Sequence, residues 1–469
     1  MKFIRCMIIF AVLSAVFSVS AESAWTYDGA KTITDGFWTL TVESVSGNNL
    51  TVTGFTGSAS EGGEDGRSID LTDVKDKAGN VYRVVAFEGF SGQNSTKSTL
   101  WAKKDILTEF IAPHCSNVSG QYAFNQCTRL TKVALNDAAD VSLSAAAFDG
   151  CASLAFFAPR KVKSAGVLLF RNCVKLTGAF ELTGSTGIGQ EAFAGTSLER
   201  IAGSNVPTVG KSAFGGCARL KSVDFPNVTT ISEKGFSNCS LLEEVVLPSV
   251  KFISAYAFQN CVLLDQNDVN ALLHPKIEQL GEKGVGCCFM GCRGIMGEIV
   301  WNMPYLTAVP PSCFENCEGI SRVVFKTPVS EMGGAAFKGI SPGAEIYLGR
   351  SIITSYGREA VGTKGVVPYP RIYVQSLNEE TLAAMEKTNA TLRKEDFGNT
   401  AWVWSPGSAY THSWITGKMY SDTATCGKVK IDNVDYPSPK VGRVYAFVAW
   451  DCCCWVIGEP PRGFSVKVR

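Results

Sequence analysis

The chain has 469 residues, 17 cysteines and a formal net charge of +1. This near-neutral charge argues against nucleic acid or an anionic membrane surface as a partner. The length exceeds the usual size of one globular core, so we expect either several domains or an elongated repeat array.

The first residues have the features of a secretory signal peptide. Lys2 and Arg5 supply a basic start, and the run that follows is apolar as far as Val19. Val19 and Ala21 are small residues at the positions that a signal peptidase reads, so residues 1–21 are predicted to be removed by cleavage near Ala21. A retained anchor is the alternative, but the run is short for a bilayer. We therefore expect a secreted or cell-surface protein with no transmembrane segment in the mature chain.

Residues 22–80 show a pattern that we interpret as an N-terminal β cap. Trp38 and Leu40 alternate with polar residues before the turn residues Gly47 and Asn48, and the alternation resumes after them, which is a hairpin signal. An open end of a repeat array exposes apolar surface and strand edges. A cap is therefore expected in front of the repeats that follow.

One motif recurs through the middle of the chain: a small residue, Phe, two variable residues and usually Cys. Its clearest copies are Ala123–Cys127, Ala147–Cys151, Ala213–Cys217 and Ala257–Cys261. The anchoring phenylalanines are separated by 24, 22, 23, 21, 22, 22, 31, 25 and 23 residues, a period typical of leucine-rich repeats. They form the predicted repeat core: Phe124, Phe148, Phe170, Phe193, Phe214, Phe236, Phe258, Phe289, Phe314 and Phe337.

Between anchors, each unit carries a short apolar alternation that predicts a strand. In the best-preserved unit, Val245 and Leu247 follow a period of two, which favours a strand with one buried face. Pro248 then ends ladder pairing because it has no amide donor. Such a short unit has no interior of its own, so it can bury its apolar side chains only by stacking on its neighbours. The sequence therefore predicts a solenoid.

The Ala-Phe-x-x-Cys-x-x-Leu motif and the Leu-x-x-Val-x-Leu-Pro strand motif resemble those of BspA-like leucine-rich repeats over residues 81–348. The resemblance implies a leucine-rich-repeat solenoid with short parallel strands and an irregular or short-helical convex side. Relatives in this family are surface or secreted proteins of bacteria and protists, many of them associated with adhesion. The resemblance therefore implies an exported binding or adhesion protein without catalysis, whose partner is a protein or glycan at a cell surface or matrix.

Some units depart from the motif. Thr196 and Ile340 stand at the usual cysteine position, as expected for a small buried side chain. The unit between Phe258 and Phe289 carries an insertion. Within this insertion we expect Asp268 to cap a short helix that bulges from one side of the array.

The repeat motif stops after residue 348. Residues 349–396 are predicted to form a terminal cap with strands and helices, and residues 397–469, which contain several tryptophans, a small β-rich C-terminal domain. Tryptophan packing between strands is favoured there, but stacking on sugar rings stays open. An alternative function is therefore a solenoid spacer that carries a C-terminal carbohydrate-binding or hydrolytic module. A structural envelope protein is a further alternative.

Most cysteines follow the repeat register, which favours buried free thiols over a disulfide framework. Two pairs have a spacing that occurs in metal sites, Cys288 with Cys292 and Cys313 with Cys317, but they fall on the same register, so no metal is predicted. The register cysteines are Cys127, Cys151, Cys173, Cys217, Cys239, Cys261, Cys292 and Cys317.

Outside the register, Cys426 is a possible disulfide partner of one of Cys452, Cys453 and Cys454. The sequence contains no recognisable nucleophile or phosphate-binding motif. We therefore predict no catalytic residue and no cofactor.

Strand positions between the inward residues are expected to face solvent and to lie side by side across the stacked units. Their mixed charge suits a protein or glycan better than a polyanion. The candidates for this ligand face are Thr131, Lys132, Phe156, Glu199, Arg200, Lys221, Asp224, Glu243, Glu244 and Arg322.

Overall fold

The structure is a computed structural model that describes residues 25–54, 67–88, 106–184, 186–282, 284–349, 351, 357, 359–363, 370 and 372. It also describes the backbone of residues 55–57, 355–356, 371, 373–374, 401–405, 408–412, 429–431, 434–436, 444–448 and 453–457. The predicted signal peptide, Cys426 and Cys452 lie outside the described residues, and only the backbone of Cys453 and Cys454 is described. Signal cleavage and the C-terminal disulfide therefore stay predictions.

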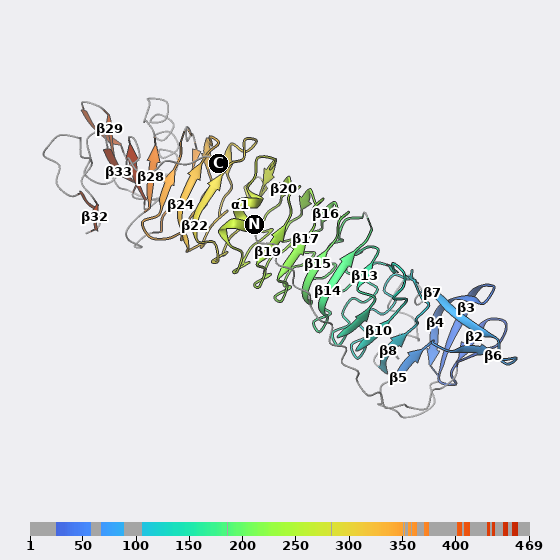
Figure 1. Ribbon diagram of the computed structural model, residues 1–469. Helices are drawn as coiled ribbons and strands as arrows, with labels where there is room; N and C mark the ends of the chain where they lie inside the picture. Colours follow the sequence, from blue (N-terminus) through green and yellow to red (C-terminus); the bar gives the residue numbers. More distant parts are fainter. Residues whose placement is uncertain are drawn as a thin grey trace, which may run out of the picture.

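The described chain forms an elongated solenoid, as the sequence predicted (Figure 1). Each unit passes through a longer strand, a shorter strand and a series of turns, so the solenoid has three sides. We call them the strand face, the short-strand side and the turn side.

The strand face contains three sheets, in which neighbouring strands are parallel except for the pair β33 and β34. Their orders are β12-β10-β8-β5, β13-β14-β15-β17-β19 and β22-β24-β26-β28-β34-β33. The strands are β5 (Arg67–Asp70), β8 (Leu107–Ile111), β10 (Lys132–Ala134), β12 (Phe156–Ala158), β13 (Lys161–Val162), β14 (Thr177–Leu182), β15 (Ser197–Ala202), β17 (Ser222–Asp224), β19 (Glu244–Val246), β22 (Gly297–Trp301), β24 (Ile320–Phe325), β26 (Glu345–Tyr347), β28 (Arg371–Val374), β33 (Val444–Val448) and β34 (Cys453–Ile457).

The short-strand side has two sheets of its own, ordered β16-β18-β20-β21 and β23-β25-β27, while β9 and β11 extend the N-terminal sheet. These strands are β9 (Asn117–Val118), β11 (Ser142–Leu143), β16 (Thr208–Val209), β18 (Thr230–Ile231), β20 (Phe252–Ile253), β21 (Gln279–Leu280), β23 (Ala308–Val309), β25 (Glu331–Met332) and β27 (Ser355–Tyr356). Two hairpins lie beyond them in the sequence: β29 (Ala401–Ser405) with β30 (Ser408–His412), and β31 (Val429–Ile431) with β32 (Val434–Tyr436).

A small closed sheet precedes the repeats. Its strands follow the order β7-β4-β3-β2-β1-β6, and β6 also pairs with β7, so the ring has no free edge. The predicted hairpin is present, with Ser46 opposite Asn49. Because β7 continues into pairing with β9, this cap joins the solenoid directly. The strands are β1 (Trp25–Tyr27), β2 (Thr32–Thr34), β3 (Trp38–Ser46), β4 (Asn49–Gly57), β6 (Val74–Asp76) and β7 (Val81–Phe87).

The anchoring phenylalanines form one continuous stack inside the solenoid. Consecutive ring centroids, from Phe124 to Phe337, lie 5.1 to 5.7 Å apart. This distance is close to the spacing of neighbouring strands, so each unit contributes one ring. Every ring in the stack is 0% exposed. One repeat of the sequence therefore forms one unit of the solenoid, and successive units are stacked at about the spacing of neighbouring strands.

The turn side repeats one backbone conformation in each unit. The residues two before and two after the phenylalanine have positive φ; around Phe236 these are Lys234 at 58° and Asn238 at 61°. The second of these positions holds Gly or Asn in every unit of the stack but the first, because these residues adopt the left-handed region at least cost. The phenylalanine N–H then donates to a carbonyl of the next unit, as Phe236 N does to Ala257 O at 2.8 Å.

The register cysteines complete this turn structure as hydrogen-bond donors. The Sγ atom of Cys239 lies 3.1 Å from the carbonyl oxygen of Phe214, one unit earlier, and the same contact recurs in other units. Burial raises the pKa of Cys217 to about 11 and that of Cys261 to about 12. The register cysteines are buried free thiols with a packing role, and such thiols are poor nucleophiles.

The insertion forms the helix α1 (Gln266–Leu272). Its N-cap is Asp265, whose carboxylate accepts from the amides of Asn267 and Asp268 at 2.7 and 3.0 Å. The prediction of Asp268 as the cap was therefore wrong. Asp268 lies in the first turn, where its own amide is one of the donors that the cap satisfies.

Two polar side chains of α1 link it to the strands on either side. The Asn270 side chain donates to Glu298 O at 3.0 Å and accepts from Val300 N at 2.9 Å on β22. The carboxylate of Asp268 accepts from the backbone of Val245 on β19. The helix thus takes the place of a strand between the second and third sheets of the strand face.

Prolines stand where two ladders stop. In most units, the residue after the strand donates its N–H to a neighbouring unit. On the strand face the acceptor lies in the next unit, as for Leu135 N and Ala158 O, and on the short-strand side it lies in the previous unit, as for Ser254 N and Ile231 O. Pro159 holds this position after β12 and Pro310 holds it after β23, and proline has no N–H. The sheet of β12 ends there, and β23 begins a sheet separate from β21.

Within the described ranges, no helix has the length and hydropathy needed to cross a membrane.

Candidate binding face

The structure places the predicted ligand-face residues along the strand face and its edge, where each is exposed or half-buried. They do not form one site. Thr131, Lys132 and Phe156 belong to the first sheet or its edge, Arg322 to the third, and Glu199, Arg200, Lys221, Asp224, Glu243 and Glu244 lie on or beside the second.

A hollow of about 460 Å³ lies on the second sheet. The outward residues Ala179, Ala202 and Ser222 have short side chains, so the surface is low between the longer side chains of their neighbours. The lining residues are Arg160, Lys161, Ala179, Phe180, Glu181, Arg200, Ile201, Ala202, Ser222, Val223, Asp224, Glu244 and Val246. Of the predicted candidates, Arg200, Asp224 and Glu244 are therefore brought together here.

A change of register creates one end of this hollow. The repeat period would place Ala158 beside Glu181, but Lys161 is the residue that pairs with Glu181. Pro159 supplies no N–H for a bond to β14, so the chain bends at Arg160 and pairs with β14 again only from Lys161. This shift brings Arg160 and Lys161 onto the strand face.

Arg160 is held in place by its surroundings. Its Nη1 donates to Thr177 O at 2.8 Å, and its Cζ lies 5.0 Å from the ring centroid of Phe180. The guanidinium also lies over Gly178, where a β-carbon would come within 3.8 Å of Cζ. Burial lowers the pKa of Arg160, although the group stays protonated. The side chain is thus oriented before any ligand arrives.

The other charges of the hollow divide into paired and unpaired groups. Lys161 and Glu181 form an ion pair of 3.1 Å. Among the described residues, no ion pair within 4.0 Å involves Arg200, Asp224 or Glu244. Arg200 and Glu244 flank Ser222 in the cross-strand register, so cationic and anionic groups occupy different strands of one sheet.

Two of the predicted ligand-face cations elsewhere on the strand face already have ion-pair partners. Lys132 lies 3.3 Å from Glu109, and Arg322 lies 3.2 Å from Glu298. The Arg322 guanidinium is also 4.7 Å from the ring centroid of Tyr347. A ligand at these positions would have to displace an existing contact, so the second sheet is the better candidate.

The helix α1 adds a carboxylate next to the hollow. Burial, with a smaller effect of the neighbouring Asp265 carboxylate, raises the pKa of Asp268 to about 6. Glu244 contributes to this shift in the same direction. Negative charge therefore accumulates where β19 meets α1.

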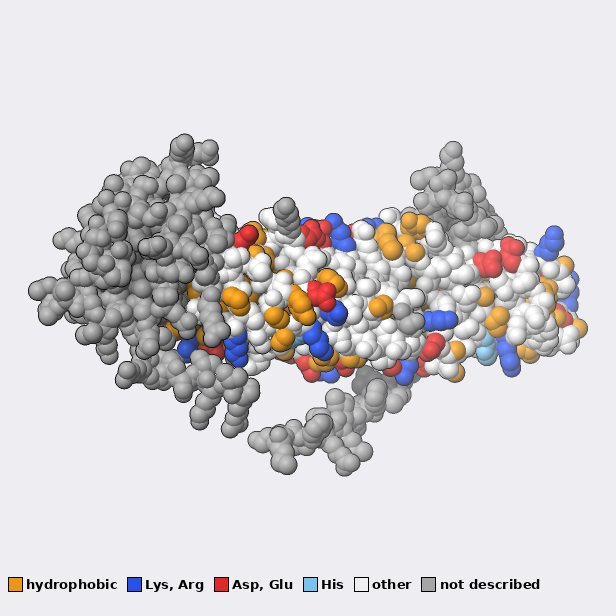
Figure 2. Space-filling model, turned by 90° about the horizontal axis from the view of Figure 1, so that it is seen from above, with side chains coloured by type: hydrophobic (Ala, Val, Ile, Leu, Met, Phe, Trp, Pro, Cys, Tyr) orange, Lys and Arg blue, Asp and Glu red, His pale blue; other side chains and the backbone are white. Residues whose placement is uncertain are grey.

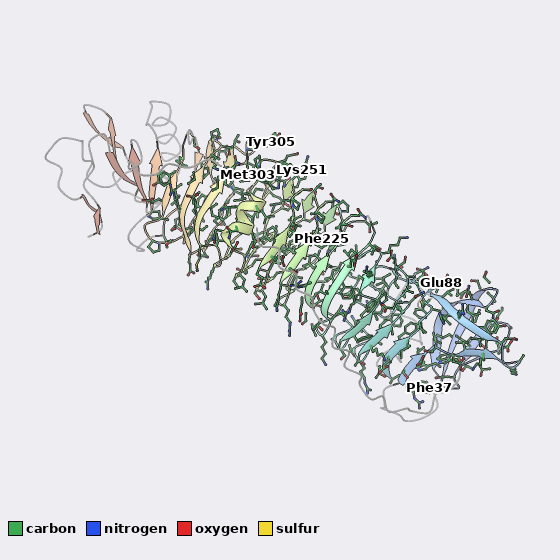
Figure 3. The ribbon with its side chains drawn as sticks, viewed as in Figure 1. Phe37, Glu88, Phe225, Lys251, Met303 and Tyr305 are labelled. Carbon is green, nitrogen blue, oxygen red and sulfur yellow. The ribbon has the colours of Figure 1, made fainter. Side chains whose placement is uncertain are left out.

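A second hollow, of about 540 Å³, lies on the short-strand side beside the ladder break at Pro310. Tyr305 lines it and is 68% exposed. Figure 2, which views the solenoid from above, shows hydrophobic side chains gathered over this part of the molecule. Figure 3 shows Tyr305 and Lys251 along the same edge, where Lys251 forms a 2.9 Å ion pair with Glu278.

Sequence reasoning missed Arg160 and Lys161 because the repeat period assigns them to a turn. The available signal was Pro159, which stands where other units have an amide donor. Across the described ranges, no group of three or more His, Cys, Asp or Glu side chains could hold a metal ion.

Comparison with known proteins identifies the repeat. No curated protein matches the chain. A leucine-rich repeat protein from Bacteroides ovatus is 18% identical, with a TM-score of 0.39 and coverage of 74% of this chain and 96% of its own. A leucine rich cell surface protein from Faecalibacterium prausnitzii is 20% identical, with a TM-score of 0.33 and coverage of 62% and 88%. A leucine rich repeat protein of T. pallidum is 22% identical, with a TM-score of 0.34 and coverage of 52% and 95%.

The family described as BspA type leucine rich repeat region (6 copies) matches residues 94–205, 186–283 and 273–361. These segments together span more than half of the chain, and they contain every ring of the phenylalanine stack. With its stacked parallel strands and repeated turn motif, the chain belongs to the BspA-type leucine-rich-repeat family.

Proposed function

We propose that this protein is exported and acts as a binding protein at the cell surface or outside the cell, with the hollow on β13 to β19 as its binding site and no catalytic step. The observation that carries the proposal is a preformed hollow whose lining includes Arg200, Asp224 and Glu244, charged groups that form no ion pair with another described residue. Export is supported by the basic start and apolar run of residues 1–21. The surface protein from Faecalibacterium prausnitzii adds a relative of stated location.

The arrangement suits binding better than chemistry. Acid–base or nucleophilic catalysis needs a reactive group held within hydrogen-bond reach of a partner group. The hollow offers arginines, a paired lysine, carboxylates and a serine that lies on the exposed sheet. We therefore assign these groups to recognition of a protein or glycan partner.

A single bulky residue on the floor of the hollow provides the test. Ala202→Trp would fill the space between Glu181 and Asp224, while Ala134→Trp puts the same ring at the equivalent strand position of the first sheet. The purified chain and both variants are applied to panels of extracellular-matrix proteins and glycans, with circular dichroism as the folding control.

The parent protein should bind at least one member of the panels. Ala202→Trp should weaken that binding at least tenfold, and Ala134→Trp should leave it unchanged. Charge reversal by Lys221→Glu with Glu244→Lys should also abolish binding without a change in circular dichroism. Equal binding by the parent protein and Ala202→Trp would reject the hollow as the site.

A further inference from the structure

The unpaired charges of the hollow are separated by sign along the stacking direction. Arg160 precedes β13 and Arg200 lies on β15, whereas Asp224 lies on β17 and Glu244 on β19. Lys161 on β13 and Glu181 on β14 also line the hollow, but they form an ion pair and so neutralise each other. The hollow thus has a positive end toward β13 and a negative end toward β19.

The sheet order sets the distances between these ends. Neighbouring strands are about 4.8 Å apart, so Arg200 and Glu244, two strands apart, are about 10 Å from each other, and β13 is about 14 Å from β17. An extended chain advances about 3.3 Å per residue, and its side chains alternate between faces. In an extended ligand segment, two residues four positions apart therefore have side chains on the same face, about 13 Å from each other. This separation lies between the two distances given for the ends of the hollow.

We propose that the hollow binds an extended segment of a partner protein that lies across the strands and carries an acidic and a basic residue four positions apart. The acidic side chain contacts Arg160 and Arg200, and the basic side chain contacts Asp224 and Glu244. This inference rests on the function proposed above and specifies its partner.

Arg160 makes the positive end of the hollow selective for a carboxylate of the ligand. Its guanidinium is already oriented by Thr177 O and the Phe180 ring, so little side-chain entropy is lost when a carboxylate binds. Arg160 has lost part of its hydration through burial, and no carboxylate among the described residues compensates for it. A ligand carboxylate would supply that compensation.

The same surface fits a glycan less well. Sugar rings bind to exposed aromatic faces, but the only aromatic residue in the described lining is Phe180, which is 2% exposed and lies under Arg160. Acidic glycans could satisfy the arginines, but they carry no cation for Asp224 and Glu244. A protein segment supplies both charges.

A peptide array read with the labelled full chain tests the proposal. Each peptide carries one aspartate and one lysine, in either order, at separations of one to eight residues in a background of serine, glycine and tyrosine; acidic-only, basic-only and neutral sets complete the array. Peptides with a separation of four should give signals at least fivefold above all other sets. A parallel glycan array is included as the competing partner class.

Charge-neutral variants assign the two ends. Arg160→Gln with Arg200→Gln should abolish the dependence on aspartate, while Asp224→Asn with Glu244→Gln should abolish the dependence on lysine. Lys161→Gln with Glu181→Gln removes the pair that is already satisfied and should change the signals less than twofold.

A silent peptide array, signals independent of separation, or profiles unchanged in both double variants would overturn the proposed partner. If the chain binds glycans or single-charge peptides instead, and Ala202→Trp abolishes that binding, the hollow remains the site and only the charge pattern is rejected. If Ala202→Trp leaves all binding unchanged, the proposed function fails as well.

Discussion

The turn side and the strand face of the solenoid follow different rules. On the turn side, each unit of the stack contributes a buried phenylalanine, a left-handed pair of residues and, in most units, a thiol that donates to the previous unit. On the strand face, the outward residues range from Ala179 and Ala202 to Arg200 and Glu244. The contacts that hold neighbouring units together thus lie on the turn side, while the outward residues of the strand face can differ from unit to unit.

The strand sides also differ from the turn side in continuity. The phenylalanine stack runs without a gap past Pro159 and Pro310, although both prolines interrupt a strand ladder. Each hollow lies beside one of these interruptions. Cohesion through the turn side therefore allows local breaks in the sheets, and these breaks shape the surface.

The largest expected effect comes from a hole in the stack. Phe214→Ala removes a ring that lies between Phe193 and Phe236 at 5.4 and 5.2 Å. Because the cavity cannot collapse against neighbours in fixed register, we expect a loss of about 3 to 5 kcal/mol in the free energy of unfolding, measured by urea denaturation. Leu241→Ala, at a residue that is 38% exposed, should cost less than about 0.5 kcal/mol. Similar losses for both variants would contradict the role of the stack.

The sequence predicted this stack because its period is visible in one residue type. A stack needs one ring per unit, so Phe124 to Phe337 recur at nearly constant separation, and the fold follows from that spacing. The hollow could not be predicted in the same way. It depends on whether Ala158 or Lys161 lies beside Glu181, and Pro159, which has no N–H to donate to β14, interrupts the regular pairing.

The helix cap illustrates the same limit on a smaller scale. Both Asp265 and Asp268 are residue types that cap helices. The choice between them depends on α1 lying between β19 and β22, where Asp268 accepts from Val245 and Asn270 bonds to Val300. These contacts join segments that lie apart in the sequence, so the local pattern around the helix does not contain them.

A second prediction concerns charge on the turn side. Arg171 forms two 2.8 Å hydrogen bonds with Asp149, whose side chain is 5% exposed, and also contacts Glu191 at 3.2 Å. Arg171→Met leaves the buried carboxylate without its counterion. Since Arg171 is partly exposed and water can reach the site, we expect a loss of about 2 to 3 kcal/mol in urea denaturation, below that of a fully buried pair.

The double variant distinguishes lost pairing from lost packing. With Asp149→Asn in the background, Arg171→Met should cost less than about 1 kcal/mol, because no buried charge is left uncompensated. An equal cost in both backgrounds would mean that the Arg171 side chain acts only by covering apolar surface.

Backbone conformation on the turn side gives a third, smaller effect. Asn238 has a φ of 61°, a conformation that a β-branched residue adopts poorly. Asn238→Val should therefore lower the free energy of unfolding by about 1 to 2 kcal/mol. Asn238→Gly loses the same side-chain hydrogen bonds, including that from Asn260 at 2.9 Å, but keeps the conformation, so it should cost less than about 0.5 kcal/mol. Equal losses for the two variants would show that the side-chain bonds, and not φ, decide the residue type.

The smallest effect lies at the strand face, where we expect a charge that lowers stability. Burial and the Asp265 carboxylate raise the pKa of Asp268 from its ordinary value of 3.8 to about 6. Between these two pH values the folded state retains a proton that the unfolded state releases, so this residue's contribution to stability falls as pH rises from about 4 to about 6. Below that window the two states are protonated alike, and above it the full cost is present.

Asp268→Asn keeps an oxygen that can accept from Val245 and removes the charge. The variant should match the parent protein at pH 4 and exceed its free energy of unfolding by about 1 kcal/mol at pH 7.5, after allowance for solvent screening of a half-buried group. Urea denaturation across this pH range measures the difference, and a constant difference at all pH values would rule out titration of Asp268. The same variant should weaken binding of a basic side chain at Glu244, because it removes a neighbouring negative charge. On the turn side the buried carboxylate of Asp149 has its counterion in Arg171, whereas the destabilising carboxylate of Asp268 lies beside the hollow, where a basic ligand can offset its cost.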